Sequence, residues 1–379
     1  MKFTEKPTYV PDIKGTISRI DERDIVFARQ DLFRIFVEDS PVFEEYYLKH
    51  PEHLKFDRKI SRKPPLGSSD PEHAPLFRSQ FEIMDRIGTE NIVDGKPAEK
   101  KVYFPREDAS RMVKSASIKF GADKVTIGPL RQEWTYSHAG CTLGDREGYE
   151  KRGTPIDLSH HYSAVSMGFR MDLDLLASAP HFPTLLATAN AYAKSAWAAV
   201  RLARAIRLMG WSARAHHFSN YRVLCVPVAV DSGMGELSRA GYLLMKEFGL
   251  GLRLSTVTTD MPLKYDKTVD IAMQSFCGQC RICADECPAG AIPKGEKVLH
   301  NGLLRWKLDE EKCYAYWHVN GTDCGICMAV CPWTKPPNPF HKFNAWLASF
   351  KGPHQQFMAW AERAVYGRHK PAPPPDFLA

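Results

Sequence analysis

The sequence lacks long hydrophobic runs: no stretch reaches the roughly 18 consecutive apolar residues that a membrane-spanning helix requires. It also lacks a block of like charge, because its 51 Lys and Arg residues and 44 Asp and Glu residues are interspersed. The resulting net charge of +7 permits an acidic partner but does not require a nucleic acid. The N-terminus has neither an apolar signal segment nor a twin-arginine pair, so a cytoplasmic protein without a membrane span is expected.

Sequence fingerprints of nucleotide cofactors are missing as well. The loop at residues 232–236 contains Gly-Met-Gly, but not the third glycine or the strand–helix frame of a dinucleotide-binding loop. No glycine-rich phosphate loop ending in Gly-Lys-Ser or Gly-Lys-Thr occurs. No motif therefore supports a flavin or nicotinamide centre.

Periodicity predicts a mixed α/β or α+β protein, because strand and helix patterns alternate before the cysteine-rich segment. Segments rich in β-branched residues predict strands at 123–128, 161–171 and 252–260. Residues 221–230 also look strand-like, and their proline suggests an edge strand.

The clearest predicted helix runs from about Thr184 to Met209, with Pro183 at its start and Gly210 just after its end. Tyr192 shares one face of this helix with a row of alanines, which would let a sheet or a flat cofactor approach closely.

The chain divides into four predicted regions. A loop-rich region with short helices is expected at residues 1–110, and an α/β core at 111–270. A ferredoxin-like domain is expected at 271–340, followed by an extended arm at 341–379.

Eight of the ten cysteines lie within 55 residues, in metal-ligand spacings rather than disulfide spacings. The first run, Cys277-x2-Cys280-x2-Cys283-x3-Cys287-Pro, has the spacing of bacterial ferredoxins. The second group is looser and ends in another Cys-Pro. In two-cluster ferredoxins the last cysteine of each run ligates the other cluster. Two [4Fe–4S] clusters are therefore predicted, one on Cys277, Cys280, Cys283 and Cys331, the other on Cys287, Cys313, Cys324 and Cys327.

Two zinc sites could also use eight cysteines, although the doubled Cys-Pro run favours iron–sulfur clusters. Cys141 and Cys225 fall outside the pattern and are expected to be buried thiols.

An ordered series of phrases in this chain resembles the cobalamin-dependent reductive dehalogenases. It includes Gly210-Trp-Ser-Ala-Arg-Ala-His, Gly233-Met-Gly-Glu-Leu-Ser-Arg-Ala-Gly, Thr259-Asp-Met-Pro-Leu-Lys-Tyr-Asp-Lys and the first cysteine run. The resemblance spans about residues 120–335 and is to the cytoplasmic, catabolic type. The related epoxyqueuosine reductases share the same core and cysteine order.

The resemblance implies a nitroreductase-like core that holds cobalamin base-off, without a protein ligand below cobalt. The sequence agrees in lacking Asp-x-His-x-x-Gly, the loop that supplies such a histidine in other cobalamin proteins. In the family a tyrosine protonates the carbon that loses the halide, and a nearby Arg or Lys stabilises the phenolate. The matching residues here are Tyr192 as the acid and Arg253 as the cation, with Asn220 lining the pocket. Tyr162 and Tyr242 are competitors for the acid.

The corrin ring and its nucleotide tail need backbone amides and small residues close by. Two glycine-bearing loops are expected to supply them, through Ser232, Gly233, Gly235, Glu236, Gly249 and Gly251.

The resemblance implies reductive dehalogenation of an organohalide. A halogenated phenol or another halogenated aromatic compound is the expected substrate. An external low-potential donor, such as a ferredoxin, a flavodoxin or a reductase, is expected, unless a C-terminal reductase module has been removed from the sequence. Two alternatives are a tRNA-modifying epoxyqueuosine reductase and a corrinoid or electron-transfer protein without chemistry of its own.

Overall fold

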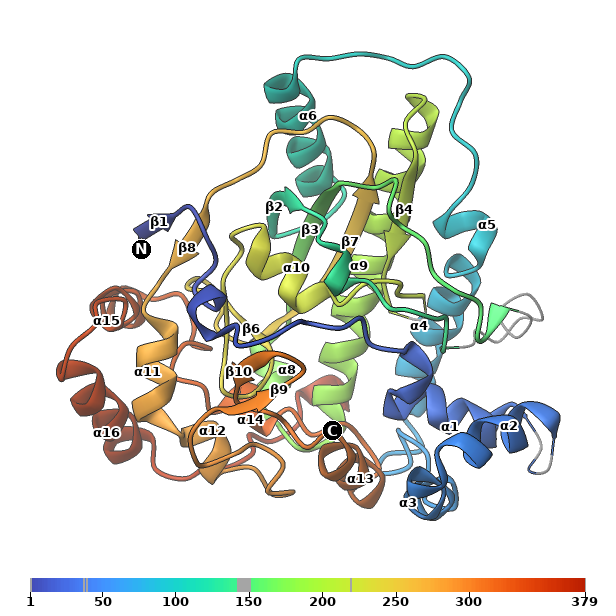
Figure 1. Ribbon diagram of the computed structural model, residues 1–379. Helices are drawn as coiled ribbons and strands as arrows, with labels where there is room; N and C mark the ends of the chain where they lie inside the picture. Colours follow the sequence, from blue (N-terminus) through green and yellow to red (C-terminus); the bar gives the residue numbers. More distant parts are fainter. Residues whose placement is uncertain (1, 37, 39, 142–150, 219, 379) are drawn as a thin grey trace.

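A four-stranded antiparallel sheet forms the centre of the α/β half of the protein (Figure 1). The computed structural model describes residues 2–36, 38, 40–141, 151–218 and 220–378. The strand order is β2-β3-β7-β4, and Val257 of β7 lies opposite both Val165 of β3 and Ala215 of β4. The strands are β2 (Lys124–Pro129), β3 (Ser163–Arg170), β4 (Ala213–His216) and β7 (Leu252–Thr259). Three of them confirm the predicted strands.

Helix α9 (Phe182–Leu208) covers one face of this sheet and confirms the predicted long helix. Its alanines 198, 199 and 203 are fully buried against Val165 and Met167 of β3, so their small side chains bring helix and sheet close together. The helix stops where Gly210 takes a positive φ of 82°, and a Cβ there would meet the Lys100 carbonyl oxygen at 2.5 Å.

Helix α10 (Cys225–Asp231) packs on the opposite face of the sheet, so the strand predicted at residues 221–230 is wrong. Pro227 lies in the first turn of the helix, where its missing N–H is not needed. Val228 and Ala229 are fully buried in the core with Ala164 of β3. Tertiary burial has therefore overridden the β-propensity of this valine-rich segment.

The N-terminal region contains more helix than predicted. It forms α1 (Val26–Arg34), α2 (Pro41–Lys49), α3 (Pro51–Ser61), α4 (Ala74–Ile87) and α5 (Glu90–Val93), followed by α6 (Arg106–Lys119). Prolines in the first turns of α2, α3 and α4 look like loop residues in the sequence but begin helices here. Met84 of α4 is buried against Ala196 of α9, which fixes this region to the core.

The cysteine-rich segment forms short helices around two sharp turns. These are α11 (Met273–Cys280), α12 (Ile282–Asp285), α13 (Glu310–Asn320) and α14 (Ile326–Ala329), with the hairpin β9 (Val298–His300) and β10 (Leu303–Arg305). Arg281 and Gly325 have positive φ angles of 54° and 68°, and each turn carries the chain from one cysteine to the next.

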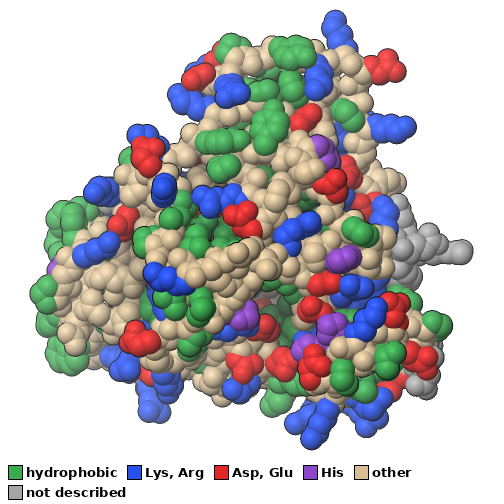
Figure 2. Space-filling view, viewed as in Figure 1, with side chains coloured by type: hydrophobic (Ala, Val, Ile, Leu, Met, Phe, Trp, Pro, Cys, Tyr) green, Lys and Arg blue, Asp and Glu red, His purple; other side chains and the backbone are tan. Residues whose placement is uncertain are grey.

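The C-terminal segment is not an extended arm. It forms α15 (Pro339–Ala348) and α16 (His354–Tyr366), and Gln355 of α16 is fully buried against α11, where it accepts a hydrogen bond from Ser275. Proline and aromatic residues suggested a chain without periodicity, but Pro339 begins a helix. Figure 2 shows hydrophobic side chains gathered at the left edge, where α15 and α16 lie.

Two further short strand pairings, β1 (Lys2–Thr4) with β8 (Thr268–Asp270) and β5 (Glu236–Leu237) with β6 (Leu243–Leu244), and the short helix α8 (Leu173–Ala177) lie outside the main sheet. The mixed α/β class and the ferredoxin-like region are confirmed, while the boundaries at residues 110, 270 and 340 stay a prediction. None of the described helices is long and apolar enough to cross a membrane.

Candidate active site

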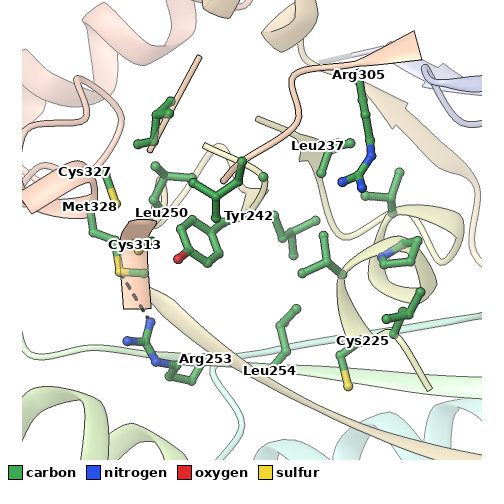
Figure 3. A pocket seen from close by; sticks show the side chains of 18 of the residues that line it. Cys225, Leu237, Tyr242, Leu250, Arg253, Leu254, Arg305, Cys313, Cys327 and Met328 are labelled. Atoms are coloured by element: carbon green, nitrogen blue, oxygen red, sulfur yellow. Dashed lines mark hydrogen bonds between the residues drawn. The ribbon is translucent and has the colours of Figure 1, made fainter. Parts of the chain in front are cut away.

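A cavity of about 560 Å³ lies between the sheet half and the cysteine-rich segment (Figure 3). Aromatic and aliphatic side chains form most of its wall, which is usual for a site that binds an organic ligand or cofactor. The sheet half contributes residues of α9, α10 and β7, and the other half contributes α13 and α14. Both halves of the protein therefore meet at one ligand-sized space.

The first predicted cysteine set surrounds a small separate pocket. Cys277 and Cys280 come from α11 and Cys283 from α12, while Cys331 reaches the same pocket from beyond α14. The structure thus brings together residues more than 45 positions apart in the sequence. Four thiols around one small space fit a cluster held by four cysteines.

The second predicted set lies in the wall of the large cavity. Cys287, Cys313, Cys324 and Cys327 all line it. Figure 3 shows Cys313 and Cys327 on the side of the cavity where Met328 also lies. A cluster on these cysteines would therefore face the remaining cavity space directly, whereas a cluster on the first set would not.

Burial keeps these thiols protonated when no metal is bound. Burial and the neighbouring Cys331 raise the pKa of Cys277 to about 12, and burial raises the pKa of Cys324 to about 12 and of Cys313 to about 11. Metal binding must therefore displace protons from thiols that have little access to water. Cys225 is partly buried in the cavity wall, and desolvation raises its pKa to about 12.

Arg239 is a residue that the sequence analysis did not single out. Its fully buried guanidinium donates hydrogen bonds to the carbonyl oxygens of Cys277 (2.9 Å), Pro293 (2.9 Å) and Gly295 (2.8 Å), and its charge lies 4.5 Å from the centre of the Trp306 ring. It fixes the backbone around the first cysteine set and places a positive charge beside it. Hydrogen bonds and charge of this kind tune the potential of a cluster.

Tyr192 and Arg253 meet in the wall of the large cavity. Tyr192 extends from α9 and Arg253 from β7, and the guanidinium carbon lies 5.2 Å from the centre of the tyrosine ring. Phe218 packs on the ring with a centroid distance of 4.9 Å. The predicted acid and cation are thus neighbours on one side of the cavity.

Arg253 is held by contacts from both halves of the protein, Thr188 on α9 and Met328 on α14. It donates hydrogen bonds to Thr188 Oγ1 (2.8 Å) and to Met328 Sδ (3.4 Å), the latter drawn as a dashed line in Figure 3. Thr188 in turn donates to Asp323 Oδ2 at 2.6 Å. Two buried polar atoms, Arg253 Nε and Asp323 Oδ1, have no hydrogen-bond partner among the described residues, so each is free to meet a ligand.

The competitors of Tyr192 separate into one inside the cavity and one outside it. Tyr242 projects into the middle of the cavity in Figure 3, and burial together with Cys327 and Cys313 raises its pKa well above the usual range. Tyr162 is 44% exposed and donates its hydroxyl to the Asp260 carbonyl, so it lies away from the cavity.

Asn220 does not line the cavity. Its side chain is buried in an ionic network, where it accepts a hydrogen bond from Arg214 and donates to the Gly88 carbonyl and to Glu90. This placement corrects the predicted pocket role, because both ends of the amide are used by the protein.

The six residues predicted to contact the cofactor do not line the cavity either, and the structure gives them packing roles. A Cβ at Gly233 would meet the Lys267 carbonyl oxygen at 2.2 Å, and one at Gly249 would meet Thr334 N at 2.4 Å. Glu236 is fully buried and accepts a hydrogen bond from Ile271 N. Ser232, Gly235 and Gly251 are similarly enclosed by neighbouring segments.

Arg305 is a second residue that the sequence did not reveal. It extends from β10 into the cavity, as Figure 3 shows, and burial lowers its pKa. No hydrogen bond or ion pair to its guanidinium is present among the described residues. Only the three-dimensional fold exposes this feature, since Leu-Leu-Arg-Trp in the sequence looks like an ordinary short strand.

Two aromatic residues of the cavity wall are held by one carboxylate. Tyr9 Oη and Trp134 Nε1 donate hydrogen bonds to Asp231 at 2.5 and 2.8 Å, and Arg131 pairs with the same side chain. Asp231 thus joins the N-terminal segment to α10 behind the cavity.

Comparison with known proteins agrees with this architecture. Residues 276–335 match the family model of the 4Fe-4S dicluster domain. The tetrachloroethene reductive dehalogenase of Sulfurospirillum multivorans is 32% identical over 268 residues, which are 63% of this chain and 53% of that protein. The enzyme of the same name from Dehalobacter restrictus is 31% identical over 291 residues, 66% of this chain and 52% of that one.

A solved structure of the catabolic reductive dehalogenase NpRdhA, in its K488Q variant, superimposes with a TM-score of 0.77 at 25% identity and covers 97% of this chain. This chain is homologous to the reductive dehalogenases. It spans about half the length of these relatives, covering 53% of the first and 49% of the NpRdhA chain.

Homology to epoxyqueuosine reductase is also present but shorter. The enzyme of Cyclobacterium marinum is 31% identical over 152 residues, 35% of this chain and 43% of that protein.

Proposed function

We propose that this reductive dehalogenase homologue removes a halogen from an aromatic substrate, using a corrinoid and two [4Fe–4S] clusters. The observation that carries the proposal is the cavity itself. Tyr192 and Arg253 stand on one side of it, and the second cysteine set stands in its wall. This arrangement supports the proposal, because the proposed proton donor and the proposed electron source border one ligand-sized space.

The residues present fit the two kinds of cofactor. Two groups of four thiols suit two clusters, and an apolar cavity of about 560 Å³ with aromatic walls suits a flat macrocycle. A bound corrinoid would supply a low-potential cobalt centre for carbon–halogen cleavage, while the clusters would supply single electrons. Replacing halide by hydrogen consumes two electrons and one proton, so an external reductant of low potential is required.

Tyr192 is the proposed proton donor. Its hydroxyl gives up a proton to the carbon that loses the halide, and the positive charge of Arg253 beside the ring stabilises the phenolate left behind. Thr188 and Met328 hold Arg253 in place. The apolar walls keep water away, which strengthens the interaction between the cation and the phenolate.

Base-off binding is part of the proposal. His300 is the one histidine among the described residues that line the cavity, and it lies on the exposed hairpin β9. The EPR spectrum of cobalt in the bound corrinoid should therefore show no splitting from an axial nitrogen, and His300→Ala should leave that spectrum unchanged.

The substrate class rests on a homologous structure. NpRdhA has been solved in complex with 3-bromo-4-hydroxybenzoic acid, with a TM-score of 0.74 and 26% identity to this chain. We infer that a halogenated phenol or hydroxybenzoate is the kind of molecule the present cavity accepts.

The test is bromide release from 3-bromo-4-hydroxybenzoate by anaerobically reconstituted protein with cobalamin and a reduced low-potential donor. Turnover of epoxyqueuosine in a tRNA stem-loop, run in parallel, would instead favour the tRNA-modifying alternative. Cobalamin uptake without either reaction would favour a carrier, and failure to take up any corrinoid would contradict the proposal.

A further inference from the structure

Three metal-ligating side chains converge at the turn between α2 and α3, away from the cavity and the cysteines. His50 Nδ1 lies 3.6 Å from Glu52 Oε1, and His53 Nε2 lies 3.7 Å from the same oxygen. One ligand atom from each residue lies within 4.8 Å of the other two. Ligands bound about 2.0–2.1 Å from a tetrahedral zinc ion are themselves roughly 3.3 Å apart. Small side-chain movements would therefore complete such a site.

The far nitrogen of each histidine faces another carboxylate. His50 Nε2 lies 3.9 Å from Asp24 Oδ1, and His53 Nδ1 lies 3.4 Å from Glu311 Oε1. Histidines that bind metals generally donate their other ring N–H to a carboxylate or carbonyl, which fixes the tautomer and the ring orientation. Both histidines here present one nitrogen to Glu52 and the other to such a partner.

These two outer carboxylates are themselves held in place. Tyr46 Oη donates a hydrogen bond to Asp24 Oδ1 at 3.1 Å, and Arg29 donates to Glu311 Oε1 at 2.6 Å. The arrangement is thus built from three elements: the turn before α3, the segment before α1, and α13 of the cysteine-rich region.

The backbone and stacking orient the rings before any ion binds. His50 closes α2, where its N–H bonds to the Tyr46 carbonyl oxygen at 3.0 Å, and Pro51 begins α3. The centres of the His50 and Tyr46 rings are 4.7 Å apart and the rings stack. The plane of the His53 ring is inclined by 26° to that of the His50 ring. The side chains of His50 and His53 are 34% and 26% exposed, so water can reach the remaining coordination position.

We propose that His50, Glu52 and His53 bind one Zn²⁺ or a similar first-row divalent cation, with water as a further ligand. Two imidazoles and a carboxylate are the donor set that such ions prefer. Figure 2 shows histidine side chains bordered by acidic ones at the lower right, where α1–α3 lie. The bound cation would attract Glu311 and Asp24 and so fasten α3 to α13, which carries Cys313. This site is independent of the proposed dehalogenation.

The test is a zinc titration of the complete protein with both clusters in place. Protein treated with EDTA under anaerobic conditions, and shown to retain its iron, is titrated with Zn²⁺ at pH 7.5 by calorimetry and by competition with a chromophoric chelator. One Zn²⁺ per chain is expected. His50→Gln combined with His53→Gln should weaken this binding at least about 100-fold, and Glu311→Gln about 10-fold.

The matched control is His160→Gln combined with His341→Gln, which removes two histidines elsewhere on the surface and should leave zinc affinity unchanged. Zn²⁺ should also raise the unfolding midpoint of the wild type but not of the His50/His53 variant, whose iron content reports that it is folded. Absence of 1:1 binding in the wild type, or equal affinity in the His50/His53 variant, would overturn the site.

Discussion

At the scale of single residues, Tyr192 is the side chain on which the proposed chemistry depends. Replacing it by Phe keeps the ring that packs on Phe218 and removes only the acidic proton. General acids of this kind contribute about 10²- to 10⁴-fold to a rate, so Tyr192→Phe should lower halide release by at least about 100-fold while cobalamin uptake stays constant. Steady-state bromide release and the absorption of bound corrinoid measure the two effects separately.

Two other tyrosines provide the controls for that experiment. Tyr162→Phe alters a tyrosine outside the cavity and should leave the rate unchanged. Tyr242→Phe alters the competitor inside the cavity. If Tyr242→Phe abolishes turnover while Tyr192→Phe does not, the acid has been assigned to the wrong residue.

Arg305 leads to a second prediction at this scale. Arg305 is a half-buried cation that forms no ion pair with the described residues, and only the charge of Glu310 partly offsets its burial, so a ligand that supplies negative charge would stabilise it. Cobalamin carries one phosphodiester in its nucleotide tail, whereas cobinamide lacks it. Arg305→Gln should therefore weaken cobalamin binding about tenfold or more and leave cobinamide binding nearly unchanged, as measured by anaerobic absorption titration. Equal weakening of both would show that Arg305 does not bind the phosphate.

At the scale of elements, an ionic network joins α5 to β4 and to the segment that follows β4. Glu90 lies 2.7 Å from Arg214 and 2.9 Å from Arg222, and Arg222 also pairs with buried Glu22. Although burial by itself would raise the pKa of Glu90, the hydrogen bond and charge of Arg214 hold it well below its usual range. The network therefore fastens α5 to β4 and to the segment after it. Asn220 belongs to this network, because it accepts a hydrogen bond from Arg214 and donates one to Glu90.

Breaking this network should destabilise the protein in a pH-dependent way. Glu90→Gln removes the carboxylate that two buried arginines share, although Arg214 keeps Asp94 and Arg222 keeps Glu22. It should lower the free energy of unfolding by about 1.5–3 kcal/mol at pH 7.5, the range for hydrogen bonds to charged groups. Because the folded-state pKa is depressed, the carboxylate stabilises the fold above the unfolded-state value of 4.5 and loses this effect as pH falls below it. The difference between wild type and variant in urea unfolding should thus be smaller at pH 3.5 than at pH 7.5.

The matched control is Glu247→Gln, which breaks an exposed pair with Lys124 and should cost at most about 1 kcal/mol at either pH. A Glu90→Gln variant as stable as this control would contradict the structural role of the network.

Elements differ in how far the sequence could predict them. β3, β7 and α9 follow from periodicity, because one face of each packs on a single core. α10 does not, since its valines favour a strand and only burial on the sheet makes the segment helical. α15 and α16 were not predicted, because their prolines and aromatic residues suggested an extended chain. These prolines stand at or beside the helix starts.

The candidate site shows the same division. The cysteine sets and the Tyr192–Arg253 pair could be predicted because a spacing rule and a family resemblance locate them. Arg239, Arg305 and Asp231 could not, because each acquires its role from residues distant in the chain. The glycine loops do not line the cavity, which the sequence could not reveal, because a glycine that admits a ligand and one that admits a neighbouring backbone look alike in a sequence.

At the scale of the whole molecule, the last cysteine of each run lies with the cysteines of the other run, and this crossed arrangement determines the order in which electrons would pass the two clusters. Cys331 follows Cys327 by four positions, yet it joins the pocket of Cys277, Cys280 and Cys283 rather than the cavity wall. The cluster on that pocket would be the one remote from the cavity, and the cluster on the second set would adjoin it. Electrons from an external donor would then pass through the remote cluster to the adjoining one before reaching the ligand.

Single cysteine replacements distinguish this crossed arrangement from one in which each run holds its own cluster. Cys331→Ala should impair the remote cluster and leave corrinoid uptake at the wild-type level, while halide release falls because the electron route is broken. Cys287→Ala, although it belongs to the first run, should disturb the cluster in the cavity wall and with it the binding and absorption spectrum of the corrinoid. Iron content, EPR of the reduced clusters and corrinoid titration measure these effects. If Cys331→Ala perturbs the corrinoid and Cys287→Ala does not, the ligand sets follow sequence order and electrons enter the cavity from the other cluster.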